Sequence, residues 1–424
     1  MTEGSSSFRV RNSKLPPAFD LLAACAGEVG WSPFLFEREG IGVASPHMGH
    51  GGWGTEPATR SAIAEMGREM LVRLRDFPVD GPGPLAVGQI PFSERGYAWM
   101  EVPMTLVRRT GSGEPWLIEL VPSDGEVRPF QPQRPMGRAP AEPFPPSQVA
   151  AVPSAERYQE MVSTAVERIR ESALRKVVLA RTMQVEAGRS LDPLRLAHRL
   201  RAVDPHAFTF VTPDGDASWP TSLVGASPEL LVSKRGLLVR STPLAGSAPR
   251  SGDPEEDRAN ADALLASAKN REEHAIVVEA IEDVLGTFCE RLDHDREPVL
   301  VETANVWHLA TRFDGQLRDP STNVVELVAA LHPTPAVGGT PTVIATAAID
   351  ELEPFDRGGY AGAVGWMDAE GDGEWAIALR CARLDGHGAT LYAGAGIVAD
   401  SQPADELDET DRKFRAFLDS LRWG

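Results

Sequence analysis

Three segments near the C-terminus decide the fold class: WAIALRCARL (375–384), ATLYAGAGI (389–397) and ELDETDRKFRAFLDSL (406–421). The first two are apolar and follow one another as the strands of a hairpin do, and the third is expected to form a helix. Elsewhere in the chain, predicted strands also come in runs instead of alternating with helices. This order favours an α+β protein with antiparallel sheets over a doubly wound parallel sheet.

The other expected elements follow from hydrophobic periodicity and turn residues. Helices are predicted at 154–176 with Ser154 as N-cap, at 192–202, at 257–292 with an interruption near Asn270, and at 324–331. Strands are predicted at 176–181, 208–211, 223–225, 229–232, 237–241 and 362–367. The uncharged stretch 327–349 contains three prolines and a Gly-Gly pair. These make a poor membrane-spanning helix, so this stretch is expected to be buried loop and strand.

A proline-rich segment divides the chain into two unequal parts. Seven prolines fall among polar residues between Ser123 and Gln148, which is typical of an extended connector. We therefore distinguish an N-terminal part of the fold (1–122), a connector (123–150) and a larger part that carries the candidate site (151–424). A domain linker and a surface loop within one fold explain this composition equally well.

Composition excludes several classes of protein. The 424 residues carry 42 Lys and Arg against 61 Asp and Glu, so the net charge of −19 argues against a nucleic-acid-binding protein. An acidic protein that handles an anion must build a local basic pocket. Three scattered cysteines suggest neither a disulfide framework nor a zinc site. With no apolar signal segment in 1–14, we expect a cytoplasmic protein without a membrane partner. It is expected to be a monomer or a weak homo-oligomer.

The predicted C-terminal helix carries the first candidate site. Glu406, Glu409 and Lys413 are spaced by three and four residues, so on a helix they share one face. The small residues of AGAGIV (393–398) before it let a ligand approach the backbone closely. Glycines before an acidic helix face do not fit a phosphate site, but they fit a metal ion that itself holds an anion. A solvated charged face with a Glu409–Lys413 pair is the other explanation.

A second acidic group lies at a predicted helix start, in KNREEH (269–274). If Glu273 faces Glu409, the two carboxylates suit Mg²⁺, which prefers oxygen ligands. No cluster of His and Cys offers a zinc site. Alternatively, Glu273 only interacts favourably with the positive end of the helix dipole.

Three more residues could carry acid–base or binding chemistry. Lys176 opens the apolar segment KVVLAR; if buried, its amine is a possible general base, and otherwise it reaches solvent. Glu229 lies at the mouth of an apolar strand, where desolvation keeps a carboxyl protonated, unless that edge is hydrated. Arg380 is predicted inside the strand 375–384, where it needs a carboxylate from the protein or from a substrate.

Nine motifs, in order over about 235 residues, resemble the chorismate-utilising enzymes, which include isochorismate, salicylate and anthranilate synthases. They are KVVLAR (176–181), GASPELL (225–231), STPLAGS (241–247), KNREEH (269–274), VWHLAT (306–311), HPTPAVGGTP (332–341), FDRGGYAGAVGW (355–366), ALRCA (378–382) and AGAGIVADSQPADELDET (393–410). The N-terminal part is similar more loosely, as in PFLFEREGIGVAS (33–45). The resemblance implies one large α+β fold with two antiparallel sheets packed together and helices around them.

The motifs also discriminate within the family. Isochorismate and salicylate synthases carry a lysine where this chain has Lys176, whereas the ammonia-using members carry glutamine. The HPTPA form (332–336) resembles isochorismate synthases, and salicylate synthases typically have a threonine near Ala336. Some relatives have an acidic residue where this chain has Asn270. If that residue supports a metal-bound water, the resemblance implies weaker Mg²⁺ binding in this chain. A salicylate synthase that also eliminates pyruvate and a non-catalytic chorismate-binding protein are the alternatives.

The resemblance implies a role for each candidate residue. Mg²⁺ bound by Glu273 and Glu409, with Glu406 supporting through water, holds a carboxylate of chorismate. Lys176 takes a proton from the water that attacks C2, and Glu229 gives a proton to the departing C4 hydroxyl. The substrate-binding positions implied by the family are Arg380, Tyr360, Gly394, Lys413, His308, Ala336 and Gly246.

Overall fold

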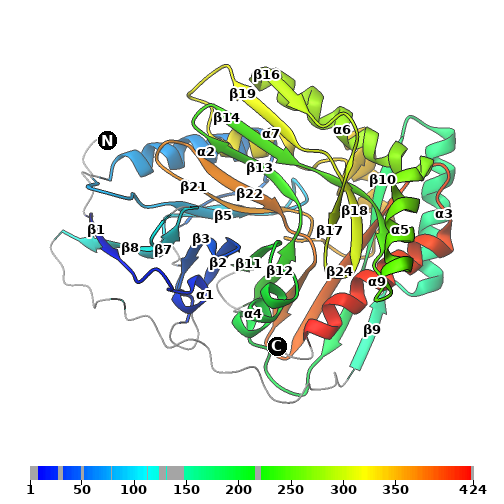
Figure 1. Cartoon of the computed structure of the whole chain (residues 1–424), viewed down its shortest axis with the longest axis horizontal. Helices are drawn as coiled ribbons and strands as arrows, with labels where there is room; N and C mark the ends of the chain where they lie inside the picture. Colours follow the sequence, from blue (N-terminus) through cyan, green and yellow to red (C-terminus); the bar gives the residue numbers. More distant parts are fainter. Residues whose placement is uncertain are drawn as a thin grey trace.

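The computed structural model describes residues 8–26, 32–48, 52–77, 79–111, 113–123, 130, 148–214 and 221–421. Within these ranges the chain forms two large sheets, one small sheet and the helices that surround them (Figure 1). Each strand pairing found there is antiparallel, as the α+β prediction requires. Most of the predicted connector lies outside the described residues.

The largest sheet contains twelve strands in the part of the chain that is described. In spatial order these are β1 (Phe8–Lys14), β8 (Trp116–Pro122), β7 (Thr105–Arg109), β3 (Ile41–Ser45), β2 (Phe34–Arg38), β11 (Phe208–Pro213), β12 (Ser222–Ser227), β23 (Cys381–Asp385), β24 (Gly388–Ile397), β10 (Lys176–Glu186) and β20 (Gly339–Thr340); β9 (Gln148–Val152) also pairs with β10. The pairing of β10 with β24 sets Ala180 opposite Gly394, so two of the quoted motifs lie side by side.

The second sheet has nine strands within the described ranges, and the third has three. The nine-stranded sheet runs β16 (Cys289–His294), β19 (Phe313–Leu317), β14 (Leu238–Thr242), β13 (Leu230–Arg235), β22 (Gly373–Ile377), β21 (Ala363–Met367), β5 (Ala86–Ile90), β6 (Ala98–Glu101) and β4 (Trp53–Thr55). The three-stranded sheet runs β15 (Leu244–Pro249), β18 (Val306–Ala310) and β17 (Val299–Glu302). Both large sheets contribute to one apolar core, for example through Val177 of β10 and Trp375 of β22.

Helices cover these sheets. They are α1 (Leu21–Ala24), α2 (Arg60–Arg75), α3 (Ala155–Glu171), α4 (Pro193–Val203), α5 (Pro254–Ala266), α6 (Ala268–Phe288), α7 (Val324–Leu331), α8 (Thr342–Leu352) and α9 (Pro403–Leu421). Helix α9 contacts β24 and α3, while α6 contacts the small sheet through β15. In Figure 1, α3, α5 and α9 lie together at one side of the molecule. No helix in the described residues is both long and apolar enough to cross a membrane.

The two parts on either side of the predicted connector share both large sheets. Strand β2 pairs with β11, and β5 pairs with β21. The N-terminal strands therefore continue sheets whose other strands come from the C-terminal part. This pairing is what a single fold requires.

Several predicted elements are confirmed with small shifts at their ends. Ser154 caps α3 by accepting a hydrogen bond from the backbone N–H of Arg157 at 3.3 Å, although the helix ends before the predicted limit. The predicted interruption near Asn270 falls at Ser267, between α5 and α6. The Ser267 side chain accepts the Asn270 N–H there and so starts the second helix.

The expected single strand at 375–384 is wrong. The segment is two strands, β22 in the nine-stranded sheet and β23 in the twelve-stranded sheet, joined by a corner at residues 378–380. Arg380 therefore stands at this corner and not inside a strand, and its φ is +49°. The segment 375–384 contains neither glycine nor proline, so its sequence gives no sign of a corner. The two halves of this apolar run belong to different sheets.

Two other expectations are wrong. The helix predicted to reach residue 292 ends at Phe288, and Cys289–His294 is strand β16, which pairs with β19. The stretch 327–349, expected to be loop and strand, contains most of α8. Pro341 stands at the N-cap of α8, where a proline costs no helical hydrogen bond, so it does not prevent the helix.

Candidate active site

One cavity brings together all the predicted site residues except Lys176 and Glu406. Its walls come from β10, β24, β15, β18, α6, α9 and the loops between them. The predicted residues that line it are Glu229, Gly246, Glu273, His308, Ala336, Tyr360, Arg380, Gly394, Glu409 and Lys413. The two remaining residues lie beside residues of this wall: Lys176 contacts Glu273, and Glu406 lies one helical turn before Glu409 on α9.

Lys176 is fully buried at the start of β10. Its Nζ lies 3.0 Å from Oε1 of Glu273 on α6. The glycine at 396 on the adjacent strand makes room for this carboxylate, because a Cβ there would lie 2.0 Å from the same oxygen. The small residues of β24 therefore admit a carboxylate from α6 beside the lysine.

Glu229 lies between β12 and β13 and is 2% exposed. Burial raises the pKa of its carboxyl to about 8, although a hydrogen bond from the Leu244 N–H and the charge of Lys176 oppose this shift. The carboxyl is therefore mainly protonated at neutral pH. A protonated carboxyl in a cavity can donate a proton to a departing group.

Three glutamates of the site each face a lysine. Besides Glu273 with Lys176, Glu406 accepts a hydrogen bond from Lys269, and Oε1 of Glu409 is 2.7 Å from Nζ of Lys413. Lys413 also donates to the Gly394 carbonyl oxygen at 2.6 Å, which ties α9 to β24.

The pKa values of the two glutamates of α9 are shifted in opposite directions. Burial alone would raise the pKa of Glu409, but Lys413, Ser247 and Lys269 together hold it below its usual range. Burial and the neighbouring charge of Glu409 raise the pKa of Glu406. Two negative charges three residues apart on one helix face repel each other, and a cation between them reduces this repulsion.

His308 and Arg380 form a hydrogen-bonded pair in the cavity wall. Nη2 of Arg380 lies 3.0 Å from Nε2 of His308, and Nδ1 of His308 lies 3.4 Å from the Gly246 carbonyl oxygen. Burial, with Arg380 and Lys413 close by, lowers the pKa of His308 to about 3. The neutral ring consequently accepts from Arg380 and donates to Gly246. Gly246 has a φ of +78°, in the left-handed region that favours glycine.

Aromatic rings complete the wall. Tyr360 stacks on Tyr392 with ring centroids 4.8 Å apart and an angle of 10° between the planes. The hydroxyl of Tyr360 would lie 3.0 Å from a Cβ at position 394, so glycine keeps that space open. Burial raises the pKa of the Tyr360 hydroxyl, which stays a neutral hydrogen-bonding group.

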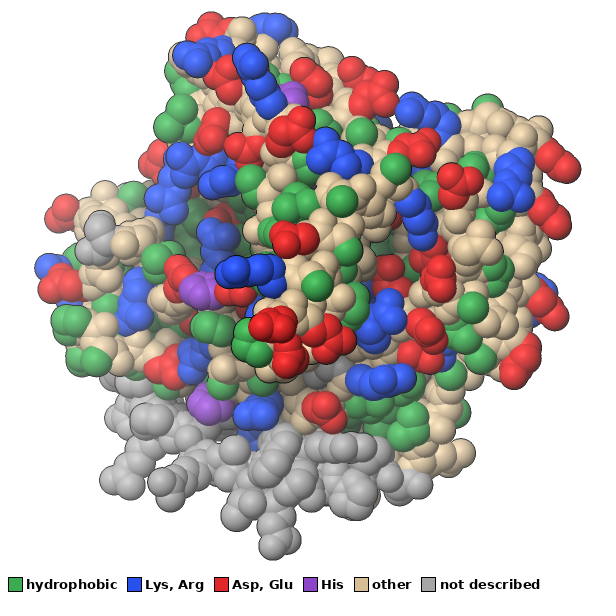
Figure 2. All heavy atoms as spheres, turned by 45° about the vertical axis from the view of Figure 1, so that its right-hand side comes forward, with side chains coloured by type: hydrophobic (Ala, Val, Ile, Leu, Met, Phe, Trp, Pro, Cys, Tyr) green, Lys and Arg blue, Asp and Glu red, His purple; other side chains and the backbone are tan. Residues whose placement is uncertain are grey.

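The surface charge is mixed and not uniformly acidic on the face shown in Figure 2. Lys and Arg side chains gather around a hollow near the middle of that face, despite the net charge of −19. Within the cavity itself, Arg380 and Lys413 supply positive charge. Local basic groups of this kind attract an anionic ligand to an acidic protein.

The sequence matches the model of one known protein family. The model of the chorismate binding enzyme family matches residues 133–422. The chain belongs to the chorismate-binding enzymes. The first expectation from its motifs is thereby confirmed.

The most similar relatives of this chorismate-binding enzyme include two isochorismate synthases. The isochorismate synthase DhbC of Bacillus subtilis is 46% identical over 276 residues, which cover 64% of this chain and 69% of that protein. The vibriobactin-specific isochorismate synthase of Vibrio cholerae is 36% identical over 392 residues, 91% of each chain. Among solved structures, MenF, the menaquinone-specific isochorismate synthase from Escherichia coli, covers 98% of this chain and 94% of its own with a TM-score of 0.80. At 23% identity this last similarity supports the fold.

The donor chemistry of the three glutamates of this chorismate-binding enzyme fits a hard divalent cation. Glu273, Glu406 and Glu409 offer carboxylate oxygens, and all three act electrostatically on the single ammonium of Lys269. All three therefore stabilise positive charge at Lys269. In the described residues, no group of three His, Cys, Asp or Glu side chains is already close enough to hold a metal ion. The carboxylates that now face lysines would have to turn inward to ligate one.

Sequence reasoning missed three residues of the site. Lys269 and Ser247 belong to quoted motifs, but no role was predicted for them from the sequence. Tyr392 lies two residues before Gly394 on β24. Two of the three could have been found from their places in KNREEH and STPLAGS. Tyr392 could have been found from the period of two along the strand, because residues 392, 394 and 396 share a face.

Proposed function

We propose that this chain is a Mg²⁺-dependent isochorismate synthase, which converts chorismate to isochorismate. Water attacks C2 of the ring, the double bonds shift, and the C4 hydroxyl leaves as water. The observation that carries the proposal is one cavity that combines a buried, protonated Glu229 with the cationic Arg380 and Lys413. Relatives at 36–46% identity that are named isochorismate synthases support the same reaction.

Glu229 and Lys176 are the proposed acid–base pair. Glu229 holds the proton that the leaving hydroxyl needs, because burial raises its pKa to about 8. Lys176 in its neutral form would take a proton from the attacking water. Both side chains are buried, which excludes bulk water from competing with them.

The proposed metal ligands are Glu273 and Glu409, with Glu406 supporting through water or a hydrogen bond. When bound, Mg²⁺ would hold a carboxylate of chorismate and neutralise the carboxylate that faces Lys176. Glu273 comes from α6 and Glu409 from α9, so each helix would supply one direct ligand.

The remaining residues would bind and orient the substrate. Arg380 and Lys413 are suited to the second carboxylate, and Tyr360 can donate a hydrogen bond from its hydroxyl. Gly394 keeps the wall open for the ring, and Gly246 offers the carbonyl oxygen that His308 contacts. His308 holds Arg380 by its neutral Nε2, and Ala336 lines the cavity without a hydroxyl.

The direct test is to incubate the purified protein with chorismate, with and without Mg²⁺, and to separate the products by chromatography. We expect isochorismate only with Mg²⁺, and the same final ratio when the reaction starts from isochorismate. Salicylate with pyruvate would assign the chain to the pyruvate-eliminating reaction instead. Intact chorismate in every tube, although the ligand binds, would leave a chorismate-binding protein.

A further inference from the structure

The three-stranded sheet forms one wall of the cavity, and it is much smaller than the other two sheets. Strand β15 contributes Leu244 to Ser247 to the wall, and β18 contributes His308. Sheets this small depend on packing against other elements for their stability. The position of the wall therefore depends on what holds the sheet in place.

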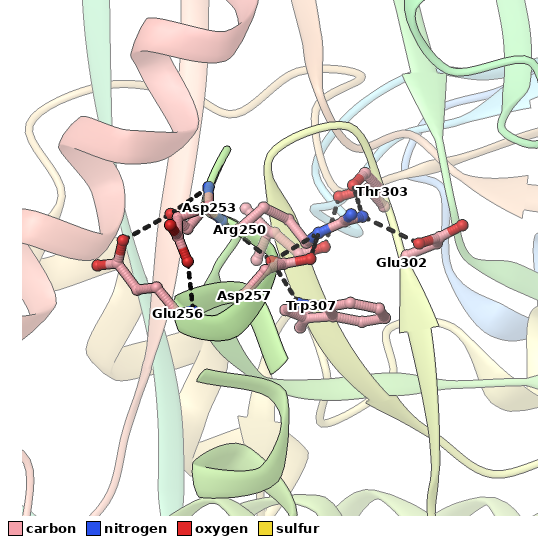
Figure 3. Close-up of polar contacts among 9 residues, drawn as sticks. Arg250, Asp253, Glu256, Asp257, Glu302, Thr303 and Trp307 are labelled. Carbon is pink, nitrogen blue, oxygen red and sulfur yellow. Dashed lines mark hydrogen bonds and ion pairs between the residues drawn. The ribbon is translucent and has the colours of Figure 1, made fainter. Parts of the chain in front are cut away.

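Arg250 fastens the end of this sheet to helix α5 (Figure 3). It directly follows β15, and its Nε lies 2.9 and 3.0 Å from the two carboxylate oxygens of Asp257 on α5. Its Nη1 donates to Glu302 at 3.0 Å and to the Thr303 carbonyl oxygen at 3.3 Å. Its backbone N–H donates to the Asn305 carbonyl oxygen at 3.0 Å. One residue thus joins β15, α5 and the β17–β18 hairpin.

Trp307 closes the same cluster. The Arg250 guanidinium lies 4.4 Å from the centroid of its ring, and Nε1 of Trp307 donates to Asp257 at 2.9 Å. An arginine stacked on an indole while paired with a carboxylate is held in one geometry. We call Arg250, Asp257, Glu302 and Trp307 the hairpin clamp.

The hairpin clamp is coupled to the cavity through β18. Trp307 and His308 are adjacent on this strand, so their side chains point to opposite faces of the small sheet. Trp307 is fixed by the clamp, and His308 accepts the hydrogen bond of Arg380. A shift of the hairpin would move the acceptor that orients the Arg380 guanidinium.

The tip of the hairpin reaches a second chamber beside the cavity. Residues 303–305 line this chamber together with Arg380 and Lys413, which also line the main cavity. Arg250 binds two of the three tip carbonyl groups, those of Thr303 and Asn305. The clamp therefore fixes the tip, which lines this chamber beside Arg380 and Lys413.

We propose that Arg250 is a positioning residue for substrate binding, which acts through the β17–β18 hairpin to hold His308 and thereby Arg380. The inference rests on the proposed function, in which Arg380 binds a carboxylate of chorismate. Lys176 lies on β10 and Glu229 in the β12–β13 loop, and neither contacts a residue of the hairpin clamp. Glu229 meets the small sheet at Leu244, at the end of β15 opposite to Arg250. The loss of Arg250 should therefore weaken substrate binding more than it slows the chemical steps.

The test is Arg250→Met in the full chain, with chorismate conversion measured at saturating Mg²⁺. We expect KM to rise about tenfold or more with kcat within about threefold, the pattern of lost uniform binding. The matched control is Arg240→Met, because Arg240 forms a 2.9 Å pair with Asp314 on the nine-stranded sheet and neither residue lines the cavity. The control should leave both constants unchanged.

Glu302→Gln is the second variant, since its exposed carboxylate can be changed without emptying the clamp. It should raise KM by a smaller factor than Arg250→Met. An unchanged KM in Arg250→Met, or a fall in kcat alone, would overturn the proposal; if that variant does not fold, an unchanged KM in Glu302→Gln would do so. A wild-type protein that does not convert chorismate would instead refute the proposed function.

Discussion

At the scale of single residues, Glu229 determines how activity should depend on pH. Its carboxyl carries a proton below its pKa of about 8 and loses it above, because burial disfavours the anion. As an acid, Glu229 works only in the protonated form. We therefore predict that kcat/KM for chorismate falls above pH 8, by about tenfold for each further pH unit. The pH profile of kcat/KM, measured with saturating Mg²⁺, gives this limb directly.

His308 does not complicate the profile. With its pKa lowered to about 3, it stays neutral over the range in which the enzyme can be assayed. A profile that stays flat to pH 10 would contradict the role of Glu229. A basic limb that survives in the Glu229→Gln variant would do the same, because that limb could not then come from this carboxyl.

Substitution of the acid and the base should separate catalysis from binding. We predict that Glu229→Gln and Lys176→Met each lower kcat by about 10²- to 10⁴-fold, the contribution of a positioned acid or base. Both replacements nearly keep the side-chain volume, so the packing of these buried sites is preserved. Circular dichroism should show the fold of the wild type, and calorimetry should still detect chorismate binding. A near-normal rate in either variant would refute the assigned role.

At the scale of elements, α9 carries residues proposed both for metal binding and for substrate binding. Glu406, Glu409 and Lys413 share one face of this helix, which the spacing in the sequence already indicated. We predict that Glu409→Gln raises the Mg²⁺ concentration needed for half-maximal activity by about tenfold or more, as loss of a ligand does. Calorimetric titration with Mg²⁺ should show the same loss of affinity without substrate.

Asp408→Asn is the matched control for α9. It removes one negative charge from the neighbouring, exposed position of the same helix. Its Mg²⁺ dependence should stay that of the wild type. Equal effects of the two substitutions would mean that overall charge, and not ligation, governs the response to Mg²⁺.

Helices and strands with a regular apolar pattern could be predicted from the sequence. The points at which the chain leaves one sheet and enters another could not. Helix α3 and strand β10 follow from apolar spacing and from the Ser154 cap. The corner at Arg380 has no local signal, because it exists only where two sheets meet. The prolines before α8 led to the wrong prediction of loop and strand. Proline at a helix start is compatible with helical geometry, so Pro341 does not prevent this helix.

The residues of the candidate site could be predicted from the sequence, but the contacts that they make with one another could not. The residues came from motifs, so their convergence on one cavity was expected. The partners of the glutamates were not, because Lys176, Lys269 and Lys413 are separated in sequence and meet the carboxylates only through the packing of α6, α9 and β10. The hairpin clamp likewise depends on a turn whose residues have no distinctive pattern.

At the scale of the whole molecule, the two sheets determine how far the chain can be divided. The predicted ranges 1–122 and 151–424 look separable in the sequence because prolines lie between them. In the structure, β2 continues the sheet of β11, and β5 continues the sheet of β21. Cutting the chain there would expose two strand edges and the apolar faces beside them, a situation that promotes aggregation.

We therefore predict that residues 148–424 expressed alone neither remain monomeric nor convert chorismate, although they carry all the proposed site residues. The loss of β2 and β5 removes Phe34, Phe36 and Val87 from the common core, and each of these side chains is fully buried in the full chain. Size-exclusion chromatography and the product assay test this. Co-expression with residues 1–123 is the control, since it restores the missing strands and should restore activity. A folded, active monomer of 148–424 would show that the N-terminal strands are dispensable and that the connector separates independent domains.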